Sequence, residues 1–329
     1  MISLNEFYSS ASELCMQEEK EKSGIKYIGK IAGRAIIAYV LIQNIFSLLL
    51  FSGRLGSLYE ADADFQSVVS IFLSLLSILI PFGIGGYFIN KRTKTDIFNL
   101  GSPVSNSLML AAVPFGFFIC LAGNYVTSVF VNFMEEIGIH LTAPDYAVPS
   151  GFGGRLIYIV SIAVVPPLVE ELAIRGVIMQ PLRKYGDKFA IVASAFIFAV
   201  LHGNLIQAPF ALIAGIGIGY AVCITNSVWT GVLIHAVNNF YSVMTEFMIE
   251  DITDEAVLNR VYLITTIALY VISISGSVLF IILRKRRRIL PSFTSLSEGR
   301  KIISFAWNIP MAIALIIMYF ITKEFVTLT

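Results

Sequence analysis

Long apolar segments recur along the chain, each separated from the next by a short polar connection. A helix rises about 1.5 Å per residue, so about 20 mostly apolar residues are enough to cross a bilayer. Segments of this kind predict spans at 31–52, 67–90, 105–132, 155–180, 188–204, 206–225, 228–248, 260–283 and 302–321. The fifth and sixth are short and adjacent. The pattern therefore predicts an all-α, polytopic transmembrane helix bundle of about eight or nine spans, with a polar N-terminus over 1–30 and one multi-pass membrane domain over 31–329.

Composition supports this class of protein. Hydrophobic residues make up 57% of the 329 residues and charged residues only 14%, with a mean hydropathy of +0.80, whereas a soluble domain has roughly 25% charged residues. The net charge of +1 and the distribution of basic residues by connection give no reason to expect nucleic acid binding. The three cysteines are scattered without a CxxC motif, which argues against a disulfide framework or a cysteine-based metal site.

The charged residues separate onto alternate connections. One set of connections carries Lys26, Lys30, Arg34, Lys91, Arg92, Lys94, Arg183, Lys184, Lys188 and the basic run 284–288. The other set carries Glu60, Asp62, Asp64, Glu135, Glu136, Asp145, Glu250, Asp251, Asp254 and Glu255. Cytoplasmic loops are enriched in Lys and Arg, so we expect a cytoplasmic N-terminus whose first apolar span acts as a signal anchor.

Two adjacent glutamates, Glu170 and Glu171, interrupt the fourth apolar segment. An ionisable side chain at membrane depth costs at least ~2.5–3.5 kcal/mol, and such residues usually serve a function. The nearby apolar segments also contain His202 and His235. We therefore treat these four residues as one candidate site.

The depths of these residues agree. With a rise of about 1.5 Å per residue, Glu170 lies about 18 Å and His202 about 21 Å from the predicted cytoplasmic ends of their helices. On the seventh segment, His235 lies about 11 Å deep and Asn239 about 17 Å deep. Three separate helices are thus predicted to bring polar groups to a similar layer.

Spacing within the fourth segment predicts different roles for the two glutamates. Glu171 and Arg175 are four residues apart with the acid first, which favours an ion pair on one helix face. Glu170 points about 100° away and is predicted to face a cavity. Pro166 and Pro167 lack backbone donors and should kink or restart the helix. Irregular backbone at this depth is tolerated where protein or a wet cavity satisfies the freed carbonyls.

The same four-residue spacing places His235 and Asn239 on one face, and Phe198 one turn below His202. We expect Phe198 to pack there and fix the orientation of the imidazole. Glycines 215, 217 and 219 lie in an apolar span and predict close helix packing. Gly203 and Asn204 predict a turn directly after His202.

The chemistry of these groups leaves two mechanisms open. A carboxylate in a partly wet apolar pocket is a usable general base, a histidine can hold the same water, and a His–Asn pair can stabilise an oxyanion. This set suffices for amide hydrolysis by activated water. Alternatively, Glu170, His202 and His235 form a two-histidine, one-carboxylate set that suits catalytic zinc.

Three motifs in this segment resemble those of a known family. They are EExxxR at Glu170-Glu171-Leu172-Ala173-Ile174-Arg175, FxxxH from Phe198 to His202, and HxxxN from His235 to Asn239. In this order and spacing they resemble the CAAX proteases and bacteriocin-processing enzymes, the CPBP or Abi family of intramembrane endopeptidases. The resemblance covers roughly 155–248.

The resemblance implies an activity and a role for each residue. Glu170 with His202 would activate water, His235 and Asn239 would form the oxyanion hole, and Glu171 and Arg175 would shape the site. It also implies a conical cavity open to the cytoplasm, no cofactor, a membrane-associated peptide or protein tail as substrate, and a bacterial cell membrane as location.

A non-catalytic function is the alternative. A bacteriocin-immunity factor or a membrane-binding or transport protein would use the same polar cavity. In a transporter, Glu170 and the histidines would form a proton relay. The absence of obvious internal repeats argues mildly against a transporter. Substrate identity and oligomeric state do not follow from the sequence.

Overall fold

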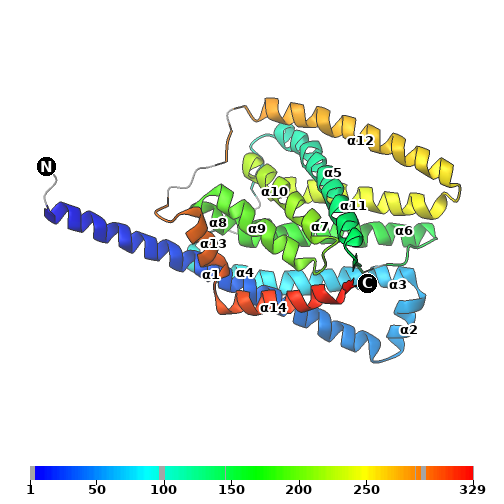
Figure 1. Ribbon diagram of the computed structural model, residues 1–329, viewed down its shortest axis with the longest axis horizontal. Helices are drawn as coiled ribbons and strands as arrows, with labels where there is room; N and C mark the ends of the chain where they lie inside the picture. Colours follow the sequence, from blue (N-terminus) through cyan, green and yellow to red (C-terminus); the bar gives the residue numbers. More distant parts are fainter. Residues whose placement is uncertain (1–3, 96–100, 145, 286, 290–293, 329) are drawn as a thin grey trace.

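The computed structural model describes residues 4–95, 101–144, 146–285, 287–289 and 294–328, with side chains from residue 12 onward (Figure 1). Asp145 and Arg286, both part of the charge pattern above, lie outside the described residues. The α-helices are α1 (Leu4–Phe51), α2 (Arg54–Ala61), α3 (Ala63–Ser74), α4 (Ile80–Thr93), α5 (Asn106–Glu136), α6 (Phe152–Ile159), α7 (Val165–Glu171), α8 (Gln180–Leu182), α9 (Asp187–Leu201), α10 (Ala208–Thr225), α11 (Val228–Asp251), α12 (Glu255–Leu283), α13 (Glu298–Ala306) and α14 (Ile309–Glu324).

Shorter elements interrupt or join these helices. Three π-helical stretches are η1 (Leu75–Leu79), η2 (Val160–Val164) and η3 (Leu172–Met179), and η4 (Arg183–Tyr185) is a 3₁₀ turn. The strands β1 (Ile139–Leu141) and β2 (Val326–Leu328) pair in antiparallel register. The predicted all-α bundle is confirmed, and each segment predicted to span the membrane is mostly helical.

The predicted number of eight or nine spans is not confirmed. Among the described residues, six helical stretches are long and apolar enough to cross a membrane, and the pair α13 and α14, bent by 76°, raises this to seven if it is one span. The stretches α9 and α11 are not among them. Helix α9 has only 15 residues, and α11 carries His235, Asn238 and Asn239. Both helices still lie within the bundle (Figure 1).

The segment that carries the glutamates is an irregular helix, as its prolines predict. Pro166 and Pro167 occupy the first turn of α7, and η2 precedes them directly. Proline removes a backbone donor and clashes with the carbonyl four residues earlier, so the preceding turn widens. A second widened stretch, η3, begins immediately after Glu171. The glutamates therefore lie on a short regular turn between two π-helical stretches.

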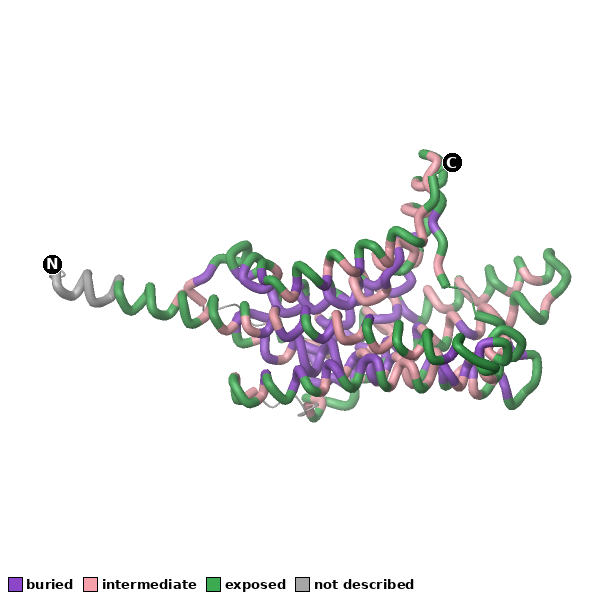
Figure 2. The backbone as a smooth tube through the Cα atoms, turned by 90° about the horizontal axis from the view of Figure 1, so that it is seen from below, coloured by how far each residue is buried: buried purple, intermediate pink, exposed green. Residues whose placement is uncertain are grey.

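Small residues bring the central helices close together. A Cβ placed on Gly217 would lie 2.7 Å from Ile119 of α5, and one on Gly215 would lie 3.1 Å from Ala195 of α9. The predicted close packing of this glycine series is confirmed. Figure 2 shows the buried backbone gathered in the middle of the bundle.

Helix α1 and strand β2 are anchored at different ends of α5. Ser23 of α1 accepts a hydrogen bond from Arg92 at the end of α4, at 3.2 Å. Strand β2 pairs with β1, which follows the far end of α5, and Thr142 N donates to Phe325 O at 3.0 Å. Helix α5 has 31 residues, a length of about 46 Å, which separates the two anchoring points.

Candidate active site

Glu171 and Arg175 form a fully buried ion pair. Arg175 Nε lies 3.2 Å from Glu171 Oε2, and both side chains are 0% exposed. Arg175 Nη2 also donates to the backbone oxygen of Gly215 at 3.1 Å. The pairing predicted from the four-residue spacing is therefore present, although Arg175 lies in the π-helical stretch η3. A buried pair of this kind fixes geometry because loss of either partner leaves an uncompensated charge.

His235 lies between the two glutamates. Its Nδ1 is 3.2 Å from Glu171 Oε1, and its Nε2 is 3.9 Å from Glu170 Oε2. Since a carboxylate accepts, Nδ1 carries the hydrogen of this bond, and Nε2 is directed toward Glu170. The contact between His235 and Glu171 was not predicted. The similar depth of the two residues was the available signal, but helix spacing alone does not show which side chains meet.

His202 follows the end of α9 and is oriented by that helix. Its Nδ1–H donates to the carbonyl oxygen of Phe198 at 2.8 Å, so Nε2 is the nitrogen left for a water molecule or a proton. Gly203 has φ +64°, and Asn204 Nδ2 donates to His202 O at 3.0 Å. The predicted turn is confirmed, and Asn204 holds it together.

The ring of Phe198 contacts three members of the site. Its centroid lies 4.8 Å from the His202 ring and 5.5 Å from the His235 ring, both edge-on. The guanidinium carbon of Arg175 lies 4.9 Å from the same centroid. Phe198 was predicted to orient His202 alone, whereas in the structure it packs against all three groups.

Asn239 is also tied to the irregular helix. Its Nδ2 donates to Ile162 O in η2 at 2.9 Å, and its Oδ1 accepts from Asn238 Nδ2 at 3.3 Å. A side-chain amide has two N–H groups, and the bond to Ile162 uses one of them.

Two residues near the site had no sequence signal strong enough to identify them. A Cβ on Gly231 of α11 would lie 2.6 Å from Glu171 Oε2, so this glycine permits the close approach of α11 to the buried carboxylate. Tyr39 of α1 donates its hydroxyl to Leu201 O at 3.5 Å, next to His202. The first helix thus reaches the site although it carries no motif.

The two glutamates differ in accessibility. The side chain of Glu170 is 22% exposed, whereas that of Glu171 is fully buried. Glu170 is therefore the carboxylate that water and substrate can reach. The conical cavity open to the cytoplasm that the resemblance implies stays a prediction.

The sequence left zinc open as an alternative ligand of Glu170, His202 and His235. Within the part of the chain that the structure describes, no group of three or more His, Cys, Asp and Glu residues is placed to hold a metal ion. The Nδ1 atoms of His202 and His235 are engaged by Phe198 O and Glu171, which leaves Nε2 of each ring available.

Comparison with known proteins identifies the class of this site. Residues 152–241 match the family described as "Type II CAAX prenyl endopeptidase Rce1-like". The match contains all three motifs and all seven residues predicted for the site. This segment is therefore similar to the Rce1-like endopeptidases, and for residues 152–241 the match agrees with the CAAX protease family predicted from the motifs. Comparisons with curated proteins and with solved structures gave no match.

The family supports protease activity, and the long apolar helices indicate an integral membrane protein. Helices α1 to α5 and α12 to α14 lie outside the matched segment. Several of these helices expose large apolar side chains, and α1 adds Tyr39 beside the matched segment.

Proposed function

We propose that this protein is an intramembrane endopeptidase that hydrolyses a peptide bond of a membrane-associated peptide or protein tail with water activated by Glu170 and His202. One observation carries the proposal: side chains from three motifs and three helices meet around His235 and Phe198. His235 lies within 3.9 Å of Glu170 and 3.2 Å of Glu171, and the Phe198 ring contacts both histidines.

The accessible carboxylate starts the reaction. Glu170 accepts a proton from the water while Nε2 of His202 accepts the second O–H as a hydrogen bond. The water oxygen bonds to the peptide carbonyl carbon and the carbonyl becomes an oxyanion. Glu170 then returns its proton to the leaving nitrogen as the C–N bond breaks. The products are a carboxylic acid and an amine, and Glu170 regains its charge.

The oxyanion is stabilised from α11. His235 donates from Nε2 to the oxyanion when both ring nitrogens carry hydrogen. Asn239 donates with the side-chain N–H that is not bonded to Ile162 O. Preorganised donors of this kind lower the barrier because they need no reorganisation as the charge develops. Glu171 acts through His235: held by Arg175, it fixes the ring so that Nε2 faces the reacting centre.

Substitution of Glu170 by Gln tests the proposal, because it keeps the shape and removes the base. The substrates are quenched fluorescent peptides with and without a farnesylated C-terminal CAAX tail, incubated with full-length protein in liposomes. Loss of a general base typically costs about 10²–10⁴-fold in rate. Glu250→Gln, an exposed glutamate near the end of α11, is the matched control and should cleave like the wild type.

Wild-type cleavage by Glu170→Gln would refute Glu170 as the base. An immunity or transport protein, the alternative function, would show no cleavage in any variant and would keep its cellular phenotype after the substitution. Thermal unfolding of each variant ensures that a lost activity does not reflect a lost fold.

A further inference from the structure

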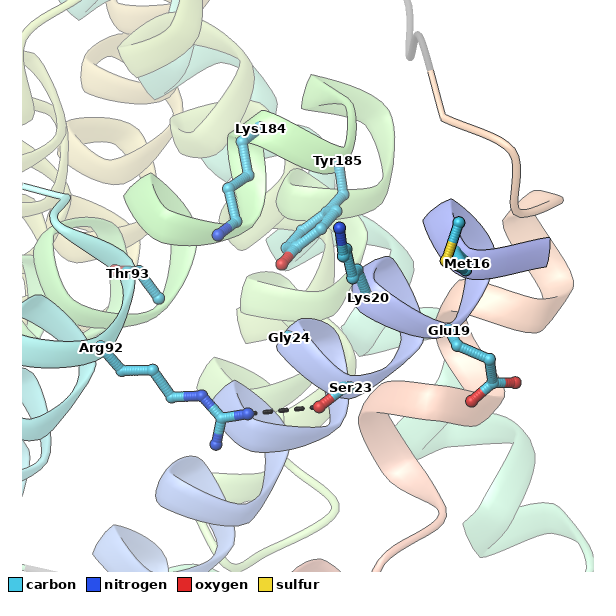
Figure 3. A pocket seen from close by; sticks show the side chains of 9 residues that line it. All are labelled: Met16, Glu19, Lys20, Ser23, Gly24, Arg92, Thr93, Lys184 and Tyr185. Carbon is cyan, nitrogen blue, oxygen red and sulfur yellow. Dashed lines mark hydrogen bonds between the residues drawn. The ribbon is translucent and has the colours of Figure 1, made fainter. Parts of the chain in front are cut away.

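A hollow of about 550 Å³ lies at the end of the bundle that the charge pattern predicts to be cytoplasmic (Figure 3). It lies between the N-terminal half of α1, the end of α4 and the turn η4. Its lining residues are Met16, Glu19, Lys20, Ser23, Gly24, Arg92, Thr93, Lys184 and Tyr185. None of them belongs to the proposed catalytic site, so the hollow calls for a separate explanation.

Positive charge dominates this hollow. Lys20, Arg92 and Lys184 come from three different elements, and Figure 3 shows their side chains around the same space. The one carboxylate of the lining, Glu19, pairs with Lys22 at 3.2 Å. Since three cations face a single, already paired anion, the hollow favours a negatively charged ligand.

Arg92 is held in place before any ligand arrives. Its guanidinium carbon lies 4.1 Å from the centroid of the Tyr27 ring, and its Nη2 donates to Ser23 Oγ at 3.2 Å. A guanidinium stacked on an aromatic ring keeps its other N–H groups in a fixed plane, which matches the oxygens of a phosphate. Lys184 is placed similarly, with its Nζ 4.8 Å from the Tyr185 ring centroid.

A second hollow of about 300 Å³ extends the basic surface along α1. It shares Glu19, Ser23 and Arg92 with the first and adds Lys22, Lys26, Tyr27 and Lys30. The three added lysines are four residues apart and so lie on one helix face. Lys30 directly precedes the apolar stretch that begins at residue 31. The basic surface therefore runs from the hollow toward the membrane.

We propose that these joined hollows bind a phosphate group, and that this phosphate belongs to the headgroup of an anionic phospholipid. The chemistry of the lining selects phosphate, and the lysine row on α1 leads to the depth at which lipid headgroups lie. Basic residues beside a membrane span attract anionic lipids. The site is independent of the proposed peptidase activity, since it shares no residue with the motifs.

Native mass spectrometry of the full-length protein tests this proposal, with phosphatidylglycerol and phosphatidylcholine added in turn. The variant Arg92→Gln/Lys184→Gln removes two of the converging charges. Lys91→Gln is the matched control, because Lys91 is exposed on the same helix and lines neither hollow. Wild type and Lys91→Gln should retain phosphatidylglycerol over phosphatidylcholine, and the double variant should bind phosphatidylglycerol about tenfold more weakly or worse.

Three results would overturn the proposal. Equal phosphatidylglycerol binding by wild type and double variant would refute the site. An equal loss in Lys91→Gln would show diffuse surface charge instead. If inorganic phosphate alone raises the unfolding temperature of the wild type while phosphatidylglycerol binding does not depend on Arg92 and Lys184, the ligand is a soluble phosphate and the lipid assignment is wrong. If the double variant fails to fold, Lys20→Gln carries the same comparison with a loss of about fivefold.

Discussion

The two adjacent glutamates should respond oppositely to the same substitution. Glu171→Gln leaves the guanidinium of Arg175, whose side chain is 0% exposed, without its anionic partner, while the hydrogen bond to the backbone oxygen of Gly215 remains. It also removes the anion that His235 contacts. Glu170→Gln changes a side chain that is 22% exposed and whose nearest ionic partner is 3.9 Å away.

The size of the difference follows from burial. Removal of one partner of a buried ion pair costs about 3–5 kcal/mol. With an unfolding entropy of about 2.1 cal/mol/K per residue, this lowers the midpoint of thermal unfolding by about 4–7 °C for a chain of this length. Glu170→Gln should stay within about 0.5 kcal/mol of the wild type, a change of less than about 1 °C.

Thermal unfolding of purified protein in one detergent, followed by circular dichroism, measures both variants side by side. Peptide cleavage is measured on the same preparations. We expect Glu170→Gln to be stable and inactive, and Glu171→Gln to be destabilised. A Glu171→Gln protein as stable as the wild type would show that the pair does not hold the site together, and the positioning role of Glu171 would be wrong.

Four further predictions follow from the structure. Gly231→Ala places a methyl group 2.6 Å from the Glu171 carboxylate and should cost about 1–3 kcal/mol of stability. In Gly83→Ala the added methyl group meets nothing within 4 Å and should stabilise its helix by up to about 1 kcal/mol. A Gly231→Ala protein with a higher unfolding temperature than Gly83→Ala would contradict this. His235→Ala should lower the turnover number by about 10²–10³-fold with a smaller change in KM, and unchanged turnover would refute the oxyanion role. The hydrogen bond from Arg155 lowers the pKa of Asp251. The stability that this pair contributes is therefore present above a pH of about 4 and is lost as the pH falls through the lowered pKa. The unfolding temperatures of wild type and Asp251→Asn should converge in acid. Cleavage should persist after exhaustive chelation in protein shown by elemental analysis to lack zinc, and its loss with recovery on zinc addition would support the metal mechanism.

The helical architecture was accessible from the sequence because lipid imposes a simple rule. Apolar stretches of about 20 residues become helices that satisfy their own backbone groups, and each predicted stretch is helical. The number of spans was not accessible. Helix α9 ends after 15 residues at Leu201, and the last predicted span bends by 76° between α13 and α14. Both features depend on contacts between helices rather than on local hydropathy.

The candidate site was predictable where spacing along one helix decides the geometry. The Glu171–Arg175 pair and the turn after His202 follow from local sequence. Contacts between helices did not follow. The bond between His235 and Glu171 and the close approach at Gly231 depend on how α11 packs against α7. An isolated glycine in a helix has no periodic signature, so only the packed structure shows which side chain Gly231 allows to approach.

The pairing of β2 with β1 has a practical consequence for topology mapping. This pairing holds β2 at the end of α5 that is remote from Ser23 and Arg92. If α5 crosses the bilayer, the start of α1 and the end of β2 therefore lie on opposite sides of the membrane. Reporters joined before α1 and directly after β2 should then give opposite signals, for example fluorescence from a cytoplasm-dependent protein at one end and activity of an export-dependent phosphatase at the other. Such a result would require an odd number of membrane spans, whether or not the short helices are spans themselves.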